Sequence, residues 1–283
     1  MYQLAGGDFF LPATTLLILT VIIADVVRRR WLIMACLMVQ LVAITIITLS
    51  AAALPWWFYA VWAIALLTWL VPGLFKYWKC RRAIRAVVVL CTLVAAGMEL
   101  SYRRLRPLPT AHFPRLIVVG DSITAGLGRA GETTWPVVLR SQHGVQIFDL
   151  SRAGCTVRQA ANSIQTSASF EGVVLIEVGG NDVIGHTNPS QFASDLENLA
   201  GKLQGPRNEL VMFELPLFPF DNAYGIIQRD IARRYNIRLI PRRFLAAIFA
   251  GPGNTIDGIH LSNAGQLELA KLIWTVVGPA LEG

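Results

Sequence analysis

The second half of the chain, residues 113–283, is predicted to form an α/β domain built on a parallel sheet. Short runs rich in Val, Ile and Leu alternate with stretches that have helical periodicity. Such nearly continuous apolar runs are typical of strands buried on both faces, so helices should cover the sheet on either side in three layers. The expected strands are 116–119, 145–150, 173–178, 210–214 and 237–240. The expected helices are 135–142, 157–167, 189–203, 223–235 and 266–277.

The last of these helices has recognisable ends. Asn263 followed by Gln266 is a variant of the capping box, which predicts the start of the helix. Gly278-Pro279 predicts its end.

Residues 1–106 are predicted to be an all-α transmembrane region of about four helices. Three stretches, 9–27, 31–54 and 55–75, approach or exceed the roughly 20 apolar residues that a membrane span requires. A fourth, 83–102, reaches that length only if Arg85 and Glu99 lie at the two membrane interfaces. The apolar runs are long, they repeat, and no basic stretch precedes them, so a cleavable signal peptide is not favoured. Residues 107–112, with Pro107 and Pro109, read as an extended linker.

The charge distribution supports a membrane and argues against nucleic acid. Residues 1–106 carry 11 Lys and Arg against 3 Asp and Glu, whereas the remainder is nearly neutral with 14 against 15. The basic residues flank apolar segments and form no stripe on a folded domain. No Lys, Glu or His pair lies within the spans, which argues against a transporter.

The basic clusters also predict topology. Clusters at 28–30 and 76–85 should be cytoplasmic, which places the N-terminus outside. Four spans then carry the second domain to the outer, periplasmic side of a bacterial inner membrane. Three spans would leave it in the cytoplasm, and the basic residues at 103–106 are the sign that opposes the four-span arrangement.

Polar segments follow the ends of three expected strands, and a fourth precedes the last helix. They are Gly120-Asp121-Ser122-Ile123-Thr124, Arg152-Ala153-Gly154-Cys155, Gly179-Gly180-Asn181-Asp182 and Asp257-Gly258-Ile259-His260. In open parallel sheets the functional site forms at the carboxyl ends of the strands. These segments are therefore expected to meet. Only Cys155 of the four cysteines lies in this half, so the domain has no internal disulfide.

The residue types in these segments suit nucleophilic catalysis. A serine hydroxyl needs a base, and the base needs an orienting group. Asp257 and His260 are three residues apart on a turn that contains Gly258, so the carboxylate can hold one imidazole nitrogen and leave the other for Ser122. A developing oxyanion needs preorganised donors. The expected donors are the N–H groups of Ser122 and Gly154 and the side-chain amide of Asn181.

The order of the four segments resembles the SGNH (GDSL) hydrolase family over roughly residues 114–281. The likeness is strongest to its arylesterase, lysophospholipase and acyl-thioesterase group. The resemblance implies a flavodoxin-like sheet, no metal or cofactor, and hydrolysis of an ester or thioester. Where relatives often have Pro after the histidine, this chain has Leu261-Ser262. Residues 1–106 are not covered.

Other features have plainer interpretations. Asp121 and Asp182 are expected to be structural acceptors that steady their loops. Gly126-Leu127-Gly128-Arg129-Ala130-Gly131 has the spacing of a dinucleotide fingerprint, but it comes too late after its strand, so we expect a mobile loop beside the nucleophile. The segment Gly120-Asp121-Ser122-Ile123-Thr124 also differs from the GxSxG nucleophile elbow of α/β-hydrolases, whose fifth residue is glycine.

Residues that could contact substrate are fewer and less well defined. The apolar segment 215–220, including Leu217, Phe218 and Phe220, either lines an acyl site or packs a loop or the bilayer. His186 is a further possible substrate contact near the site.

Together these observations predict a membrane-anchored serine esterase that acts on acyl, including acetyl, esters of an envelope carbohydrate or lipid. The alternatives are an acyltransferase that uses the same residues and an accessory subunit of a membrane assembly. The expected partners are the bilayer, the ester substrate and a further membrane protein.

Overall fold

The computed structural model describes residues 2–27, 29–70, 78–164 and 170–282. The chain divides into two compact units, of which the first comprises Gln3–Arg103 with Phe218–Asn222 and the second Tyr2, Arg104–Leu217 and Ala223–Gly283.

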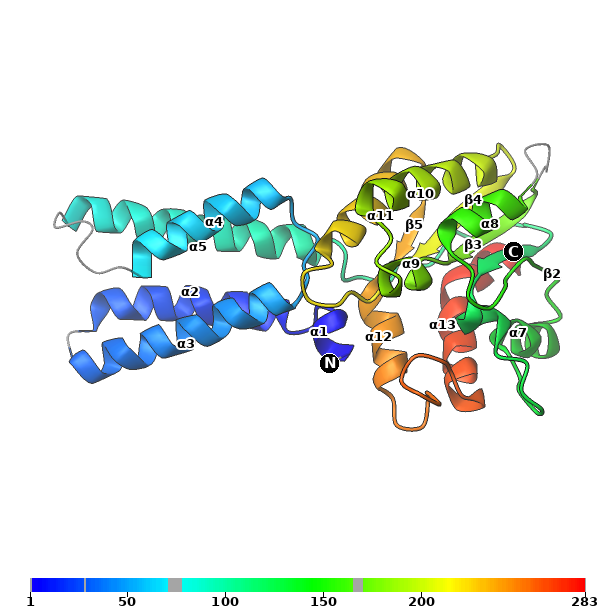
Figure 1. Ribbon diagram of the computed structural model, residues 1–283, viewed down its shortest axis with the longest axis horizontal. Helices are drawn as coiled ribbons and strands as arrows, with labels where there is room; N and C mark the ends of the chain where they lie inside the picture. The colour runs from blue at the N-terminus through cyan, green and yellow to red at the C-terminus, as the bar shows by residue number, and fades with distance from the viewer. Residues whose placement is uncertain (1, 28, 71–77, 165–169, 283) are drawn as a thin grey trace. The chain divides into compact units, whose positions relative to one another are not determined.

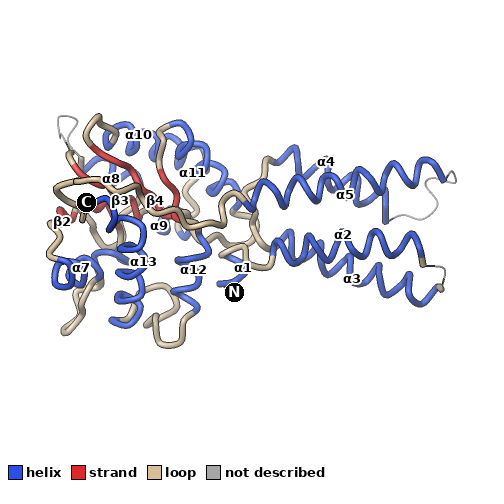
Figure 2. The backbone as a smooth tube through the Cα atoms, turned by 180° about the vertical axis from the view of Figure 1, so that it is seen from behind, coloured by secondary structure: helices blue, strands red, loops and turns tan. Residues whose placement is uncertain are grey.

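The first unit is helical. After the short α1 (Tyr2–Ala5) come α2 (Phe10–Val26), α3 (Arg30–Leu49), α4 (Trp56–Leu70) and α5 (Trp78–Leu100). Figure 2 shows α2 beside α3 and α4 beside α5, and both pairs are in contact. The segments Arg30–Leu49 and Arg81–Leu100 are long and apolar enough to cross a membrane, while Phe10–Ala24 and Trp56–Leu70 are shorter apolar helices. The expected span 55–75 ends outside the described residues.

Side chains of this unit pack through small and aromatic residues around a few buried polar groups. The indole of Trp69 donates to the Oε1 of Gln40 at 3.2 Å, and that of Trp62 donates to the hydroxyl of Thr92 at 3.1 Å. These bonds join α4 to α3 and to α5, as expected for polar residues that link helices in an apolar surrounding.

The second unit contains a five-stranded, wholly parallel sheet. Its strands are β1 (Leu116–Gly120), β2 (Ile147–Asp149), β3 (Gly172–Glu177), β4 (Asn208–Phe213) and β5 (Arg238–Ile240), in the order β2-β1-β3-β4-β5. This is the flavodoxin-like order, and it reverses direction between β1 and β3, where ligands of such sheets bind. The central strands β1 and β3 are buried along their whole length.

Helices cover both faces of the sheet, as the apolar strands require. Figure 1 shows α8 (Val157–Ser163), α10 (Pro189–Leu203) and α11 (Asn222–Arg234) on one face. On the other are α7 (Trp135–His143), α12 (Arg242–Ala250) and α13 (Asn263–Leu281). The short helices α6 (Ser122–Ala125) and α9 (Gly180–Ile184) directly follow β1 and β3. The predicted three-layer α/β architecture is confirmed.

Several predicted boundaries were wrong. Strand β2 is only three residues long, and the whole of α12 was missed, because its apolar face follows β5 after only Pro241. The N-cap of α13 is Ser262, whose Oγ accepts the N–H of Gly265, and not Asn263. Helix α13 also continues through Pro279 to Leu281. The end of the expected helix 157–167 lies outside the described residues.

Candidate active site

Ser122 lies at the first turn that follows β1. Asp121 is the N-cap of α6, and its Oδ1 accepts the N–H of Ile123 at 3.0 Å. Ser122 is half-buried, and its hydroxyl makes no hydrogen bond within the described part of the chain. The strand and its cap therefore hold the hydroxyl at the carboxyl edge of the sheet with its hydrogen-bonding capacity unused.

The buried carboxyl of Glu177 holds the turn that carries Ser122, and the sequence analysis did not identify it. Glu177, the last residue of β3, accepts the hydroxyl of Thr124 at 2.8 Å and the N–H of Asp121 at 3.4 Å. Burial, and then the charge of Asp121, raise the pKa of Glu177 well above its ordinary value. A Cβ at Gly120 would lie 2.5 Å from the Thr124 hydroxyl oxygen, so only glycine allows this approach. A polar residue at the end of an otherwise apolar strand was the available sequence signal.

The structure brings Asp257 and His260 together as expected. The Oδ2 of Asp257 is 2.7 Å from the Nδ1 of His260. Its Oδ1 accepts the N–H groups of His260 at 2.8 Å and Ile259 at 3.0 Å, and Gly258 has φ +95°. These hydrogen bonds, with that of the His260 N–H the largest cause, lower the pKa of Asp257 below its ordinary range. The carboxylate thus fixes one ring nitrogen and leaves Nε2 for another partner.

The charge of His260 acts on Asp121, the residue before Ser122. Burial raises the pKa of Asp121 to about 6, and the bond from Ile123 and the charge of His260 oppose that rise. Neither Nε2 of His260 nor the hydroxyl of Ser122 makes a hydrogen bond among the described residues. Catalytic hydrogen bonds are often loose without substrate and tighten in the complex, so this geometry is compatible with a base and its nucleophile.

The two remaining residues that were expected to donate to an oxyanion come from the turns after β2 and β3. Gly154 is exposed with φ +73°, and nothing lies within 4 Å of a Cβ built there, so its backbone is open to an approaching group. The amide Nδ2 of Asn181 donates to the Oδ2 of Asp121 at 3.2 Å and to the carbonyl of Cys155 at 3.1 Å. Asn181 therefore joins all three turns, and donation to an oxyanion would share or replace one of these bonds.

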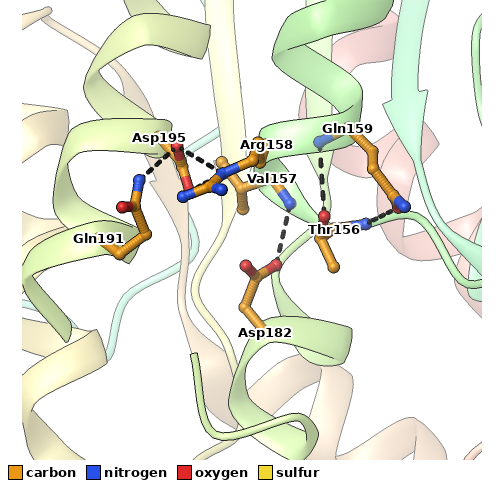
Figure 3. A network of polar contacts seen from close by, with 7 residues as sticks. All are labelled: Thr156, Val157, Arg158, Gln159, Asp182, Gln191 and Asp195. Atoms are coloured by element: carbon orange, nitrogen blue, oxygen red, sulfur yellow. Dashed lines mark hydrogen bonds and ion pairs between the residues drawn. The ribbon is translucent and has the colours of Figure 1, made fainter. Parts of the chain in front are cut away.

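Asp182 acts as a structural acceptor. Its Oδ2 accepts the N–H of Val157 at 2.9 Å, at the start of α8 (Figure 3). In the same network Thr156 and Gln159 form a complete capping box. The turn that carries Gly154 is thereby tied to the turn that carries Asn181. Burial raises the pKa of Asp182, and the bond from Val157 opposes that rise.

Residues from α13 tie the histidine segment to the nucleophile segment. The buried side chain of Gln266 donates to the carbonyl of Ile123 at 2.9 Å and accepts the N–H of Trp135 at 2.8 Å. Asn263 accepts the N–H of Thr133 at 2.9 Å and donates to the carbonyl of Gly131 at 2.9 Å. Both side chains were predicted to cap a helix, and they instead bridge distant parts of the chain.

The residues predicted to contact substrate differ in their exposure to solvent. Leu217 is fully buried, so its side chain packs in the interior, and a contact with substrate stays a prediction. Phe218 and Phe220 are 41% and 73% exposed. His186 is exposed with φ +52°, and its ring makes no hydrogen bond among the described residues.

The glycines of 126–131 lie in a loop after α6, and its expected mobility stays a prediction. The carboxylate of Glu132 accepts the N–H groups of Leu127 and Arg129 at 2.9 and 3.0 Å, which fixes the loop from its far end. Within the described ranges no group of three or more His, Cys, Asp and Glu could hold a metal ion.

Comparison with known sequences places this geometry among ester hydrolases. The profile described as the GDSL-like Lipase/Acylhydrolase family matches residues 118–267, which include every segment discussed above. Esterase TesA of Pseudomonas aeruginosa is 26% identical over 179 residues, which cover 59% of this chain and 89% of that protein. Thioesterase 1/protease 1/lysophospholipase L1 of Escherichia coli K12 is 24% identical over 161 residues, covering 53% and 77%.

Solved structures agree on the fold. The psychrotrophic esterase EstA from a Pseudoalteromonas species has a TM-score of 0.53 at 17% identity, covering 60% of this chain and all of that one. The crystal structure of TesA has a TM-score of 0.50 at 26% identity, covering 59% and 99%. Both likenesses leave two fifths of this chain unmatched.

Proposed function

This chain belongs to the GDSL-like lipase/acylhydrolase family and has the fold of its esterases, and from that premise we propose a membrane-anchored serine esterase with Ser122, His260 and Asp257 as its triad. Carboxylic ester hydrolysis is the activity of the family. The observation that carries the assignment of residues is the 2.7 Å contact between Asp257 and Nδ1 of His260, which leaves Nε2 as the base.

The proposed reaction has two acyl-transfer steps. Ser122 Oγ attacks the acyl carbonyl carbon while Nε2 of His260 takes the hydroxyl proton. The developing oxyanion is met by the N–H groups of Ser122 and Gly154 and by the amide of Asn181. The imidazolium then protonates the leaving alcohol, and an acyl-enzyme remains. Water, deprotonated by the same His260, releases the acid and restores the serine.

Membrane anchoring is supported by the surface of the helical unit. Of the 29 large hydrophobic side chains that are exposed in the described structure, 22 lie between Phe9 and Leu100. An apolar surface of this extent marks contact with lipid or with another protein. The two long apolar helices have the length for spans, and the two shorter ones would complete a four-span anchor.

The proposed substrate is an acyl or acetyl ester of a carbohydrate or lipid of the cell envelope, because a four-span anchor places the catalytic unit outside the cytoplasm. The relatives carry the names esterase, thioesterase and lysophospholipase, which supports ester or thioester bonds. An acyltransferase is the second candidate, since a sugar hydroxyl could replace water. A single span is enough to anchor a protein. Because four helices exceed this need, we also propose that the helical unit binds another membrane protein.

The first experiment labels the full chain in detergent with a fluorophosphonate serine probe. Wild type should label, and Ser122→Ala should not, whereas Ser151→Ala, a serine that hydrogen-bonds to Asp149, should label like wild type. Equal labelling of wild type and Ser122→Ala would refute the nucleophile. An ester panel from acetyl to long acyl chains, with and without a sugar acceptor, then separates hydrolysis from transfer.

The topology is tested with a reporter fused to the C-terminus. A reporter such as alkaline phosphatase, which is active only outside the cytoplasm, should be active. An inactive phosphatase together with a fluorescent cytoplasmic reporter would indicate three spans and a cytoplasmic catalytic unit.

A further inference from the structure

A cavity of about 300 Å³ adjoins the oxyanion side of the proposed active site. It is lined by Arg152, Ala153, Gly154, Cys155 and Gln159. Because Gly154 belongs both to this cavity and to the proposed oxyanion donors, a group bound here would lie next to the reacting carbonyl. Arg152 supplies the only charged side chain in the lining.

The backbone of Arg152 is fixed next to the nucleophile turn. Its N–H donates to the carbonyl of Gly120 at 3.1 Å, and its own carbonyl accepts the N–H of Cys155 at 3.1 Å. Gly120 is two residues before Ser122. The position of the Arg152 Cα is therefore fixed by β1 and by the turn from Arg152 to Cys155.

The guanidinium of Arg152 makes no ion pair with any residue that the structure describes. Its one hydrogen bond to a backbone oxygen is the long 3.5 Å contact with the carbonyl of Gln159, and no carboxylate among the described residues lies within ion-pair distance. Asp121 and Asp182, which lie close enough to influence Cys155, are 3% and 1% exposed and do not reach the cavity. By contrast, the neighbouring Arg158 is paired with Asp195 at 3.2 Å.

The other polar group of the lining is already used. The side-chain oxygen of Gln159 accepts the N–H of Thr156 at 3.0 Å within the capping box. The cavity thus offers a ligand backbone groups and the guanidinium of Arg152, which lies beside the Cys155 thiol and makes no ion pair among the described residues. A guanidinium has the fork geometry that binds carboxylate and phosphate oxygens in pairs.

We propose that the substrate carries a carboxylate or phosphate group, on the acyl or the alcohol side of the ester, which Arg152 binds in this cavity. The inference rests on the proposed esterase function and specifies its substrate class. Arg152 is then a specificity residue that contacts a remote group of the substrate, and it takes no part in proton transfer.

The test compares matched charged and neutral esters on the full chain in detergent. On the acyl side the pair is 4-nitrophenyl hydrogen succinate and 4-nitrophenyl butyrate. On the alcohol side it is 1-butyrylglycerol 3-phosphate and monobutyrin. Arg152→Gln should lower kcat/KM for at least one anionic ester by about 10- to 100-fold, the effect of one charge-assisted contact. The neutral partner should change less than about threefold, and Arg152→Lys should recover part of the loss.

The control is Arg207→Gln. Arg207 is also exposed and pairs with Glu171. It precedes β4, so it lies at the amino-terminal ends of the strands, whereas the proposed site lies at their carboxyl ends. Arg207→Gln should leave all four rates unchanged. Equal losses for charged and neutral esters in Arg152→Gln, or no loss for any, would overturn the proposal.

A binding measurement separates this proposal from the esterase function itself. On the Ser122→Ala background, 1-butyrylglycerol 3-phosphate or succinate monobutyl ester should raise Tm, and the rise should disappear when Arg152→Gln is added. Monobutyrin should change the Tm of Ser122→Ala equally with and without Arg152→Gln. A rise that is independent of Arg152, or no rise for either anion, refutes the anion site even if Ser122 proves to be the nucleophile. If turnover does not depend on Ser122 but the rise in Tm depends on Arg152, only the proposed esterase function is refuted.

Discussion

Gln266 donates a 2.9 Å hydrogen bond to the carbonyl of Ile123 across 143 residues of sequence. Ile123 follows the proposed nucleophile, and Gln266 follows the proposed base by six residues on α13. The same side chain accepts the N–H of Trp135, so both ends of the amide are used in the interior. One buried amide thus sets the separation between the segments that carry Ser122 and His260.

We predict that Gln266→Leu lowers kcat by about 10-fold or more with little change in KM. The substitution leaves the Ile123 carbonyl and the Trp135 N–H unpaired in the interior, at about 1–3 kcal/mol each, and releases α13 from the nucleophile turn. Steady-state kinetics with a short neutral ester would measure this. Gln142→Leu, an exposed glutamine of α7, is the control. If kcat is unchanged in a folded Gln266→Leu, the amide does not position the site.

Glu177 should tolerate Gln and not Leu. Burial raises the pKa of its carboxyl and so favours the neutral form, which accepts hydrogen bonds from Thr124 and Asp121, and an amide oxygen can accept the same bonds. Leu removes the acceptor, so Glu177→Leu should lower the free energy of unfolding by about 1–3 kcal/mol per unpaired group. Urea unfolding would compare the two variants. A Glu177→Gln that is as unstable as Glu177→Leu would mean that the residue is buried as a charged carboxylate.

Asp121 should make stability fall as pH rises through about 6. Burial raises its pKa to about 6 in the folded protein, whereas the unfolded chain releases this proton near pH 4. Between these values the folded state binds more protons, so the stability present below pH 4 is lost as Asp121 ionises. Relative to Asp121→Asn, wild type should lose about 2–3 kcal/mol from pH 4 to 7.

Urea unfolding of both proteins at several pH values tests this prediction. Asp149→Asn, near the end of the edge strand β2, serves as an exposed comparison. Parallel stability curves for wild type and Asp121→Asn would show that the carboxyl is not perturbed.

Gly154→Ala should reduce kcat because φ +73° is unfavourable for alanine. The left-handed conformation costs an L-residue about 1–2 kcal/mol, and relaxing it would turn the N–H away from the oxyanion. Space for the methyl group is available, so the fold should persist. Gly205→Ala, where φ is not positive and the nearest atom is 3.5 Å away, is the matched control for kinetics and Tm. Wild-type kcat in Gly154→Ala would remove this donor from the mechanism.

The local elements were largely predictable. The runs that became the centres of β1, β3 and β4 are apolar because they are covered on both faces, and a pattern of that kind has one simple structural solution. Helix α12 was missed because it follows β5 without a turn signal. The role of Leu217 was left open because an apolar residue after a strand can face either the interior or a ligand, and only packing decides which.

The sequence by itself determined that a parallel α/β domain follows an apolar helical region, and which segments end at strand edges. Those facts depend on periodicity, composition and turn residues, which are local. The tertiary structure alone decided that Glu177 lies beneath the nucleophile turn, that Asn181 bonds to Asp121, and that Gln266 bridges α13 to Ile123. These contacts join residues 53 to 143 positions apart, and no local pattern encodes the partner of a side chain at that distance.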